Sequence, residues 1–147
     1  MTINSIQDEI IEEFEDIEDW MDRYAYIIEL GTSLPALPEE EKTPQNLIEG
    51  CQSRVWITAD LDGEGNIIFR ADSDALIVKG IVALLLRVVS GHKPREILDA
   101  DLYFINRIGL SEHLSPTRSN GLVAMVRQMR NYATAFDMLQ HRDSGTA

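Results

Sequence analysis

The sequence has a single cysteine, Cys51, and only three histidines in 147 residues. One thiol cannot form a disulfide within the chain, and it cannot by itself supply the thiolates that structural zinc sites and iron–sulfur clusters use. We therefore expect no internal disulfide, no metal site and no cofactor held by this chain.

Long apolar runs are also missing. The longest, Gly80–Leu86, is far below the roughly 20 residues that a membrane-spanning helix needs. The first residues are polar and acidic, unlike the basic and then apolar start of a signal peptide. We expect a cytoplasmic protein in a reducing compartment, with no membrane association.

The charge is uneven along the chain. Residues 1–50 hold 14 acidic and 2 basic residues, and residues 51–147 hold 11 of each sign, which gives the net charge of −12. An anionic surface repels the phosphates of nucleic acids and of anionic lipids, so we expect no nucleic-acid binding. A basic protein partner and a merely solvated acidic face both stay open.

The length and the 44% hydrophobic content fit one domain over residues 1–147. The acidic region 5–31 shows two helical patterns, the first with a capping box at Ser5 and the second ending at Gly31. The segment 32–46 is rich in proline and is predicted to be a loop. The tail after about residue 140 is expected to be disordered.

The middle of the chain predicts an antiparallel hairpin, with strands near 55–58 and from Ile67, and with turn residues at 62–66 between them. The apolar segment 75–89 predicts a largely buried central helix, because it lacks a single apolar stripe. Further helices are predicted at 94–99, where Pro94 suits the first turn, at 101–109 and in a long final segment from Ser115. In the final helix Arg127 and Arg130 are predicted to face outward, and the buried stripe is predicted to hold Leu122, Val126, Met129, Ala133 and Phe136. The fold class is a helix-rich α+β domain with a small antiparallel sheet packed by helices on one side.

Cys51 lies between the loop and the first strand, in the stretch Gly50, Cys51, Gln52 and Ser53. A lone cysteine is often a small buried hydrophobic residue. Here it lies outside any apolar periodicity, beside a glycine that leaves the backbone uncrowded, and next to two side chains that can hydrogen bond to a sulfur anion. A reactive thiol and a structural one remain alternatives on position alone.

Several reactions of a thiol do not fit this sequence. Neither His92 nor His113 forms a recognisable nucleophile–base motif with Cys51, as a cysteine hydrolase requires. Thioredoxin-like exchange requires a second cysteine. Transfer of a persulfide sulfur needs only one thiolate, which attacks the outer sulfur of a partner's persulfide.

Charged residues outside this stretch have two interpretations each. Asp72, Ser73 and Asp74 suit the N-cap of the central helix, although two carboxylates so close could also form a site. Arg118 stands at a helix start, where a cation gains nothing from the helix dipole, so it either pairs with a carboxylate or steadies the thiolate. Lys79, in an apolar helix, has the same two interpretations.

The stretch from Gly50 to Trp56 resembles the SufE/CsdE family of sulfur acceptors, whose signature is Gly-Cys-Gln-Ser followed by Val-Trp. Three further stretches are similar to that family and follow in the expected order, at 26–31, at 72–80 and at 114–122. Together they extend over roughly residues 20 to 132.

The resemblance implies a SufE/IscU-like fold in which Cys51 takes a persulfide sulfur from a SufS/CsdA-type cysteine desulfurase and stimulates it. The sulfur would pass to a SufBCD-type scaffold for iron–sulfur cluster assembly. Pyridoxal phosphate would belong to the desulfurase, and this chain would not be an enzyme in its own right. We expect Gly50, Gln52, Ser53 and Arg118 to support the thiol. Two further residues, Asp74 and Lys79, would contact the partner.

Two other functions stay open. The chain could be a non-catalytic module that docks to the desulfurase and regulates it, with Cys51 incidental. It could also be a cluster scaffold, although a single cysteine argues against that.

Overall fold

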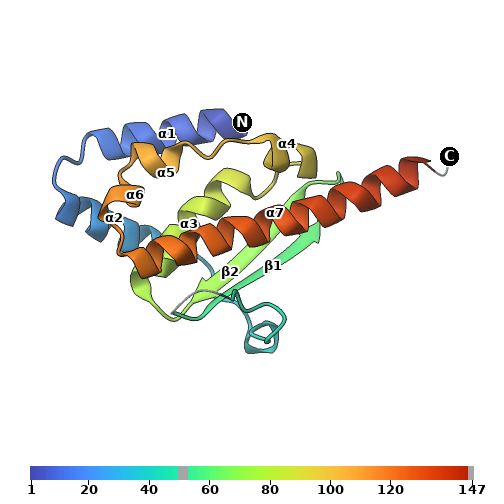
Figure 1. Cartoon of the computed structure of the whole chain (residues 1–147), viewed down its shortest axis with the longest axis horizontal. Helices are drawn as coiled ribbons and strands as arrows, with labels where there is room; N and C mark the ends of the chain where they lie inside the picture. Colours follow the sequence, from blue (N-terminus) through green and yellow to red (C-terminus); the bar gives the residue numbers. More distant parts are fainter. Residues whose placement is uncertain (50–52, 146–147) are drawn as a thin grey trace.

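The computed structural model describes residues 1–49 and 53–145, with side chains up to residue 141. It is a helix-rich α+β fold in which the central helix contacts the second helix on one side and a two-stranded hairpin on the other, while the last helix crosses the hairpin (Figure 1). The fold class predicted from the sequence is confirmed. The elements are α1 (Ile3–Glu15), α2 (Trp20–Thr32), the 3-10 turn η1 (Glu39–Glu41), β1 (Val55–Leu61), β2 (Ile67–Ser73), α3 (Leu76–Val89), α4 (Pro94–Asp99), α5 (Phe104–Arg107), α6 (Leu110–His113) and α7 (Pro116–Gly145).

The first helix starts one turn before the predicted capping box. Thr2 is the N-cap, because its Oγ1 accepts the backbone N–H of Ser5 at 3.0 Å. Ser5 lies inside the first turn, and its hydroxyl donates to the carbonyl of Thr2 at 2.9 Å. The predicted cap at Ser5 is therefore wrong by three residues. Thr2 takes this role because the hydroxyl of a threonine accepts the same hydrogen bond as that of a serine. Ile10 and Phe14 are fully buried, as their helical spacing predicts.

The end of α2 also differs from the prediction. Gly31 does not end the helix, which continues through Thr32, and Gly31 is buried. A Cβ on Gly31 would lie 2.7 Å from the amide nitrogen of Gly80 in α3, and a Cβ on Gly80 would lie 2.0 Å from the carbonyl oxygen of Ile27. The two glycines are thus where two helix backbones touch, and side chains at these positions would force the helices apart.

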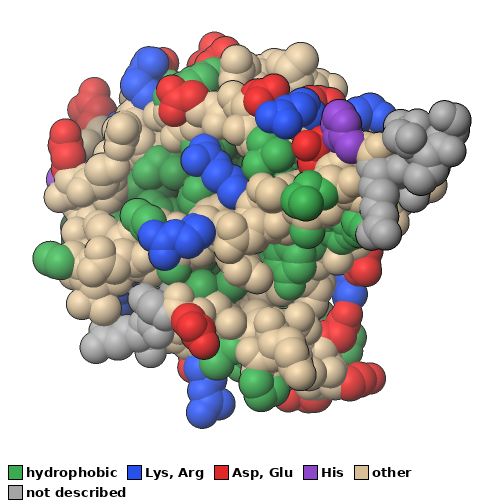
Figure 2. Space-filling model, turned by 45° about the vertical axis from the view of Figure 1, so that its right-hand side comes forward, with side chains coloured by type: hydrophobic (Ala, Val, Ile, Leu, Met, Phe, Trp, Pro, Cys, Tyr) green, Lys and Arg blue, Asp and Glu red, His purple; other side chains and the backbone are tan. Residues whose placement is uncertain are grey.

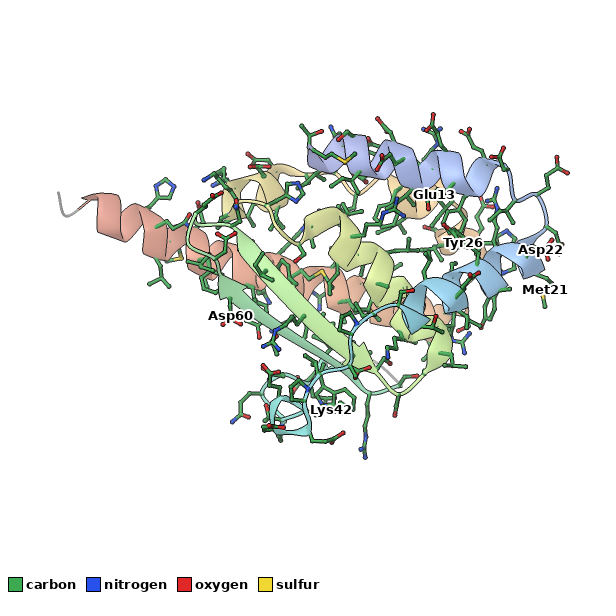
Figure 3. The ribbon with its side chains drawn as sticks, turned by 180° about the vertical axis from the view of Figure 1, so that it is seen from behind. Glu13, Met21, Asp22, Tyr26, Lys42 and Asp60 are labelled. Atoms are coloured by element: carbon green, nitrogen blue, oxygen red, sulfur yellow. The ribbon has the colours of Figure 1, made fainter. Side chains whose placement is uncertain are left out.

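One polar cluster joins the first three helices. The hydroxyl of Tyr26 in α2 donates to Oε1 of Glu13 in α1 at 2.6 Å, and Arg87 in α3 donates to the same oxygen at 2.9 Å (Figure 3). The hydrogen bond from Arg87 holds the pKa of Glu13 below its usual value. Burial and the carboxylate of Glu13 together raise the pKa of Tyr26 to about 12. The cluster therefore favours a neutral tyrosine and an ionised glutamate.

The hairpin was predicted correctly. Its strands pair in antiparallel register from Val55 opposite Ser73 to Leu61 opposite Ile67. At the tip, Oδ1 of Asp62 accepts the backbone N–H groups of Glu64 at 2.8 Å and of Asn66 at 2.9 Å. Gly65 in the same turn has a φ of 83°, which favours glycine.

One face of the hairpin contributes to the core. Ile57, Ile67 and Phe69 are buried there, and α3 and α7 cover them (Figure 1). The ring of Tyr132 in α7 packs edge-to-face on Phe69, with the centroids 6.4 Å apart. The prediction that helices pack on one side of the sheet is confirmed.

The other face of the hairpin is covered in part by the loop that contains η1. Arg70 on β2 pairs with Glu41 of that loop, and Asp60 on β1 lies 3.9 Å from the same guanidinium. Both charged partners on the strands are solvent-exposed. This loop is the one predicted at 32–46, and it leads directly toward Cys51 in the sequence.

The central helix α3 is buried almost throughout, as predicted. Its N-cap is Ala75, which has no capping side chain, so the predicted caps at 72–74 are wrong for the helix. Asp72 and Ser73 end β2 instead, Asp74 follows the strand, and all three bond to neighbouring loops. The predicted helix at 94–99 is confirmed as α4, and the predicted helix at 101–109 becomes the two short helices α5 and α6.

The last helix, α7, continues to Gly145, past the point near residue 140 where we expected disorder to begin. Leu122, Met129 and Ala133 are buried and Arg127 and Arg130 are exposed, as the periodicity predicts, whereas Val126 and Phe136 of the predicted stripe are only half-buried. Within the described part of the chain, no helix is both long enough and apolar enough to cross a membrane.

Candidate functional site

The predicted thiol site lies partly outside the described residues. Gly50, Cys51 and Gln52 belong to the undescribed segment, so the predictions for these three stay predictions. Ser53, the fourth residue of the motif, is described and half-buried. The site is therefore built from the described residues that precede and follow the thiol in the chain.

The segment before the thiol is fixed to the outer edge of β1. The N–H of Ile48 donates to the carbonyl of Val55 at 2.8 Å, and the N–H of Ile57 donates to the carbonyl of Asn46 at 2.9 Å. Ile48 is buried, and its neighbour Leu47 is 38% exposed. The chain is thus held by backbone bonds up to two residues before Gly50, and an apolar side chain lies exposed beside that point.

The segment after the thiol is fixed to the end of β2. The N–H of Arg54 donates to Oδ1 of Asp74 at 3.0 Å, and the N–H of Asp74 donates back to the carbonyl of Arg54 at 3.2 Å. That carbonyl also accepts the hydroxyl of Ser73 at 2.8 Å. Asp74 therefore fixes the backbone of Arg54, three residues after Cys51, to the end of β2. The predicted contact of Asp74 with a partner stays a prediction.

A buried carboxylate joins the loop, the hairpin and the central helix. Asp72 is only 4% exposed, and it accepts the backbone N–H of Ser73 at 2.8 Å and of Leu37 at 3.1 Å. The Nζ atoms of Lys79 and Lys42 lie 3.4 Å and 3.6 Å from its two oxygens. Lys79 therefore has an intramolecular ion pair, whereas its predicted contact with a partner is untested.

The pKa of Asp72 reports the balance of these contacts. Burial alone would raise it, but the N–H groups of Ser73 and Leu37 and the charges of Lys79 and Lys42 outweigh burial and lower it. The carboxylate is thus ionised at neutral pH. Because Asp72 bonds to the amide of Leu37, it fixes the loop that precedes Cys51 against the outer face of the hairpin.

Arg118 lies at the start of α7 and is exposed. Its guanidinium donates to the hydroxyl of Tyr24 in α2, so its partner is a phenol and not one of the carboxylates that the sequence suggested. This contact joins the first turn of α7 to α2. A role for Arg118 at the thiol stays a prediction.

A hollow of about 450 Å³ lies beside the described end of the loop. One wall is the segment from Pro44 to Glu49, and the other is α7 at Ala124, Arg127 and Gln128. Within the described residues, no group of three or more histidine, cysteine or carboxylate side chains is placed to hold a metal ion. The described site therefore offers a hollow beside the loop and two points, at Ile48 and Arg54, where hydrogen bonds fix the chain on either side of the thiol segment.

Sequence reasoning missed two residues of this region. Asp72 was interpreted as a helix cap, although its alternation on β2 places it on the same face as Arg70, away from the core. Arg127 was predicted only to face outward. Its position beside the loop is a tertiary contact that no local pattern indicates.

Comparison with known proteins finds that the profile of the SufE family, described as Fe-S metabolism associated domain, matches residues 8–133. The solution structure of a hypothetical protein from Thermus thermophilus is similar, with a TM-score of 0.74 and 21% sequence identity over 90% of this chain and 96% of that chain. At this identity the likeness concerns the fold alone. The matched region spans the whole motif around Cys51 and Arg118.

Proposed function

Because the chain belongs to the SufE family over most of its length, we propose that Cys51 accepts a persulfide sulfur from a cysteine desulfurase. Family membership gives the chain a role in iron–sulfur metabolism, and the resemblance first noted from four short motifs is confirmed. The observation that carries the finer proposal is that the only cysteine of the chain lies inside the matched region, within the motif Gly-Cys-Gln-Ser.

The chemistry needs one thiol on each protein. The thiolate of Cys51 attacks the outer sulfur of the desulfurase persulfide, and a new sulfur–sulfur bond forms as the bond to the desulfurase cysteine breaks. The desulfurase cysteine leaves as a thiolate and takes up a proton, so no external oxidant or reductant is consumed. Transfer to an iron–sulfur scaffold of the SufBCD type is the same exchange one step further on. A thiolate of the recipient attacks the outer sulfur held on Cys51, and Cys51 leaves as a thiolate. The thiol must stay reduced between turnovers, which suits the cytoplasm.

The fixed chain ends on both sides of the thiol support this proposal. Backbone bonds at Ile48 and Arg54 hold the chain on either side of a short segment that carries Cys51. A carrier thiol benefits from such anchoring because a short segment between two fixed points can be presented to a partner without unfolding the sheet. In this proposal Ser53 and Arg118 support the segment, and Asp74 and Lys79 lie at the docking side.

The alternative is a regulator that docks to the desulfurase and stimulates it without receiving sulfur. The two functions differ in whether Cys51 becomes loaded. Incubation with a cysteine desulfurase and cysteine, followed by intact mass measurement without reductant, should show one added sulfur that maps to Cys51. Cys51→Ser should fold normally, gain no sulfur and fail to stimulate.

A desulfurase that is stimulated equally by Cys51→Ser would refute sulfur transfer and favour the regulator. The thermal unfolding temperature of the variant serves as the control for folding, because a conservative cysteine-to-serine change should leave it unchanged within error.

A further inference from the structure

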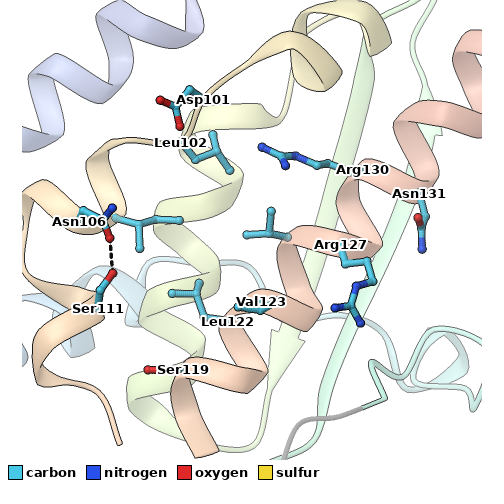
Figure 4. A pocket seen from close by; sticks show the side chains of 12 residues that line it. Asp101, Leu102, Asn106, Ser111, Ser119, Leu122, Val123, Arg127, Arg130 and Asn131 are labelled. Carbon is cyan, nitrogen blue, oxygen red and sulfur yellow. Dashed lines mark hydrogen bonds between the residues drawn. The ribbon is translucent and has the colours of Figure 1, made fainter. Parts of the chain in front are cut away.

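A groove of about 600 Å³ lies between α7 and the chain around α5 and α6 (Figure 4). On one side it is bordered by α7 between Ser119 and Asn131, and on the other by the chain around α5 and α6. The α7 residues in the groove recur three or four positions apart, so they form one continuous stripe of the helix. Within this stripe Leu122 is buried and Val126 is half-buried, whereas Val123 and the two arginines are exposed.

The floor of the groove is apolar and its exposed side is cationic. Leu122, Val123 and Val126 supply the apolar surface, and Val123 is 55% exposed. Arg127 and Arg130 extend along the same stripe, and Figure 2 shows Lys and Arg side chains among hydrophobic ones on this face of the molecule. Arginine is enriched at protein interfaces, and the exposed part of Val123 supplies an apolar contact beside it.

The two arginines differ in their present partners. Arg130 donates to the carbonyl of Ala100 at 3.1 Å, which fixes its guanidinium at the edge of the groove. Arg127, among the residues that the structure describes, has no hydrogen bond or ion pair to another side chain. The lining has two arginines and one carboxylate, Asp101, so it is locally cationic in a chain whose net charge is −12.

Arg127 links the groove to the described end of the loop that precedes the thiol. This residue lines the groove and also lines the 450 Å³ hollow whose other wall is the segment Pro44–Glu49. Glu49 directly precedes Gly50 in the sequence. A partner that approaches the described end of the loop at Glu49 therefore also meets Arg127 and the adjoining groove.

We propose that this groove is the docking site for a segment of the cysteine desulfurase that carries a carboxylate beside an aliphatic side chain. The carboxylate would pair with Arg127, whose planar guanidinium suits bidentate recognition, and the aliphatic side chain would cover Val123. This inference rests on the proposed sulfur transfer, because it assigns the groove to the same partner. It adds a recognition surface that lies outside the thiol motif.

The test is the affinity of the full-length protein for a purified desulfurase, measured by calorimetry. Arg127→Glu places a like charge against the docking carboxylate and should weaken binding about tenfold or more. Val123→Asp, which removes the apolar contact, should act in the same direction. Thermal unfolding of both variants should show that they are folded, since neither change removes a buried side chain.

The matched control is Lys93→Glu, which makes the same change in charge at an exposed residue. Lys93 contacts the carbonyl of Glu64 at the hairpin tip, at the opposite end of the strands from the thiol segment. Its affinity for the desulfurase should stay within about twofold of the wild-type value.

The measurements also separate the two proposals. Wild-type affinity in both Arg127→Glu and Val123→Asp, with sulfur still loaded onto Cys51, would overturn the groove and leave sulfur transfer standing. A wild-type protein that neither binds the desulfurase nor accepts sulfur would overturn both. Normal loading by Arg127→Glu with impaired delivery to a scaffold would also overturn the assignment, because the groove would then serve the recipient of the sulfur.

Discussion

Replacing Asp72 by alanine should lower the free energy of unfolding by about 3 kcal/mol at neutral pH. The carboxylate accepts two backbone N–H groups, from Leu37 at 3.1 Å and from Ser73 at 2.8 Å. Each hydrogen bond to a buried charge contributes about 1.5 to 3 kcal/mol. The amide of Ser73 lies closer to solvent and can bond to water after the change, so we take the lower part of the summed range. Lys42 and Lys79 can also turn to water and add little.

The effect should depend on pH in a defined direction. The pKa of Asp72 in the folded state lies below its ordinary value of 3.8, so its ionised form stabilises the fold. That contribution is complete above the pKa of the unfolded chain and is lost as the pH falls through the folded-state pKa. Urea unfolding of wild type and Asp72→Ala should therefore differ by a constant amount between about pH 7 and pH 5, and the difference should shrink below about pH 4.

The control for this prediction is Asp60→Ala. Asp60 lies on the same face of the hairpin, but its side chain is 73% exposed and its contact with Arg70 is 3.9 Å. Its replacement should change the free energy of unfolding by less than about 0.5 kcal/mol. Equal stabilities of wild type and Asp72→Ala at pH 7, or a difference that persists unchanged into the acid range, would refute the assignment of Asp72 as the ionised anchor of the loop.

Two further changes test the packing of the first helices. Gly80→Ala should lower the free energy of unfolding by about 2 to 3 kcal/mol, because its Cβ would lie 2.0 Å from the carbonyl oxygen of Ile27. The matched control in thermal unfolding is Gly63→Ala, because a Cβ at Gly63 would have nothing within 4 Å. An unchanged unfolding temperature for Gly80→Ala would contradict the close approach of α2 and α3. Glu13→Gln should lower the pKa of Tyr26 from about 12 toward, but not to, the ordinary value of 10, because burial remains when the carboxylate charge is removed. Absorbance at alkaline pH follows this titration, and an unshifted curve for the tyrosine would show that Glu13 does not control it.

The elements governed by local pattern were predictable. The hairpin follows from β-branched and aromatic residues on either side of turn residues, and Asp62 and Gly65 form that turn as expected. The buried central helix follows from an apolar segment without a polar face. Cys51 could be singled out because it is the only thiol of the chain and lies in a recognisable motif.

The errors share a cause. Gly31 has the chemistry of a helix end, but its real partner is Gly80, 49 positions further along the chain. Asp72 has the chemistry of a helix cap, but it bonds to Leu37, 35 positions earlier. Of the two roles predicted for Arg118, the carboxylate partner is replaced by the hydroxyl of Tyr24, and support of the thiol stays a prediction.

The sequence alone thus determined the helix-rich α+β class, the hairpin and the identity of the single thiol, because each depends on residue type and on spacing within a few positions. Only the tertiary structure decided that Asp72 anchors the loop and that Arg127 borders both the loop segment Pro44–Glu49 and the groove beside α7. These contacts join residues that are distant in sequence. Their geometry is set by how α3, α7 and the hairpin pack, and a polar side chain carries no local signal of which distant partner that packing will bring to it.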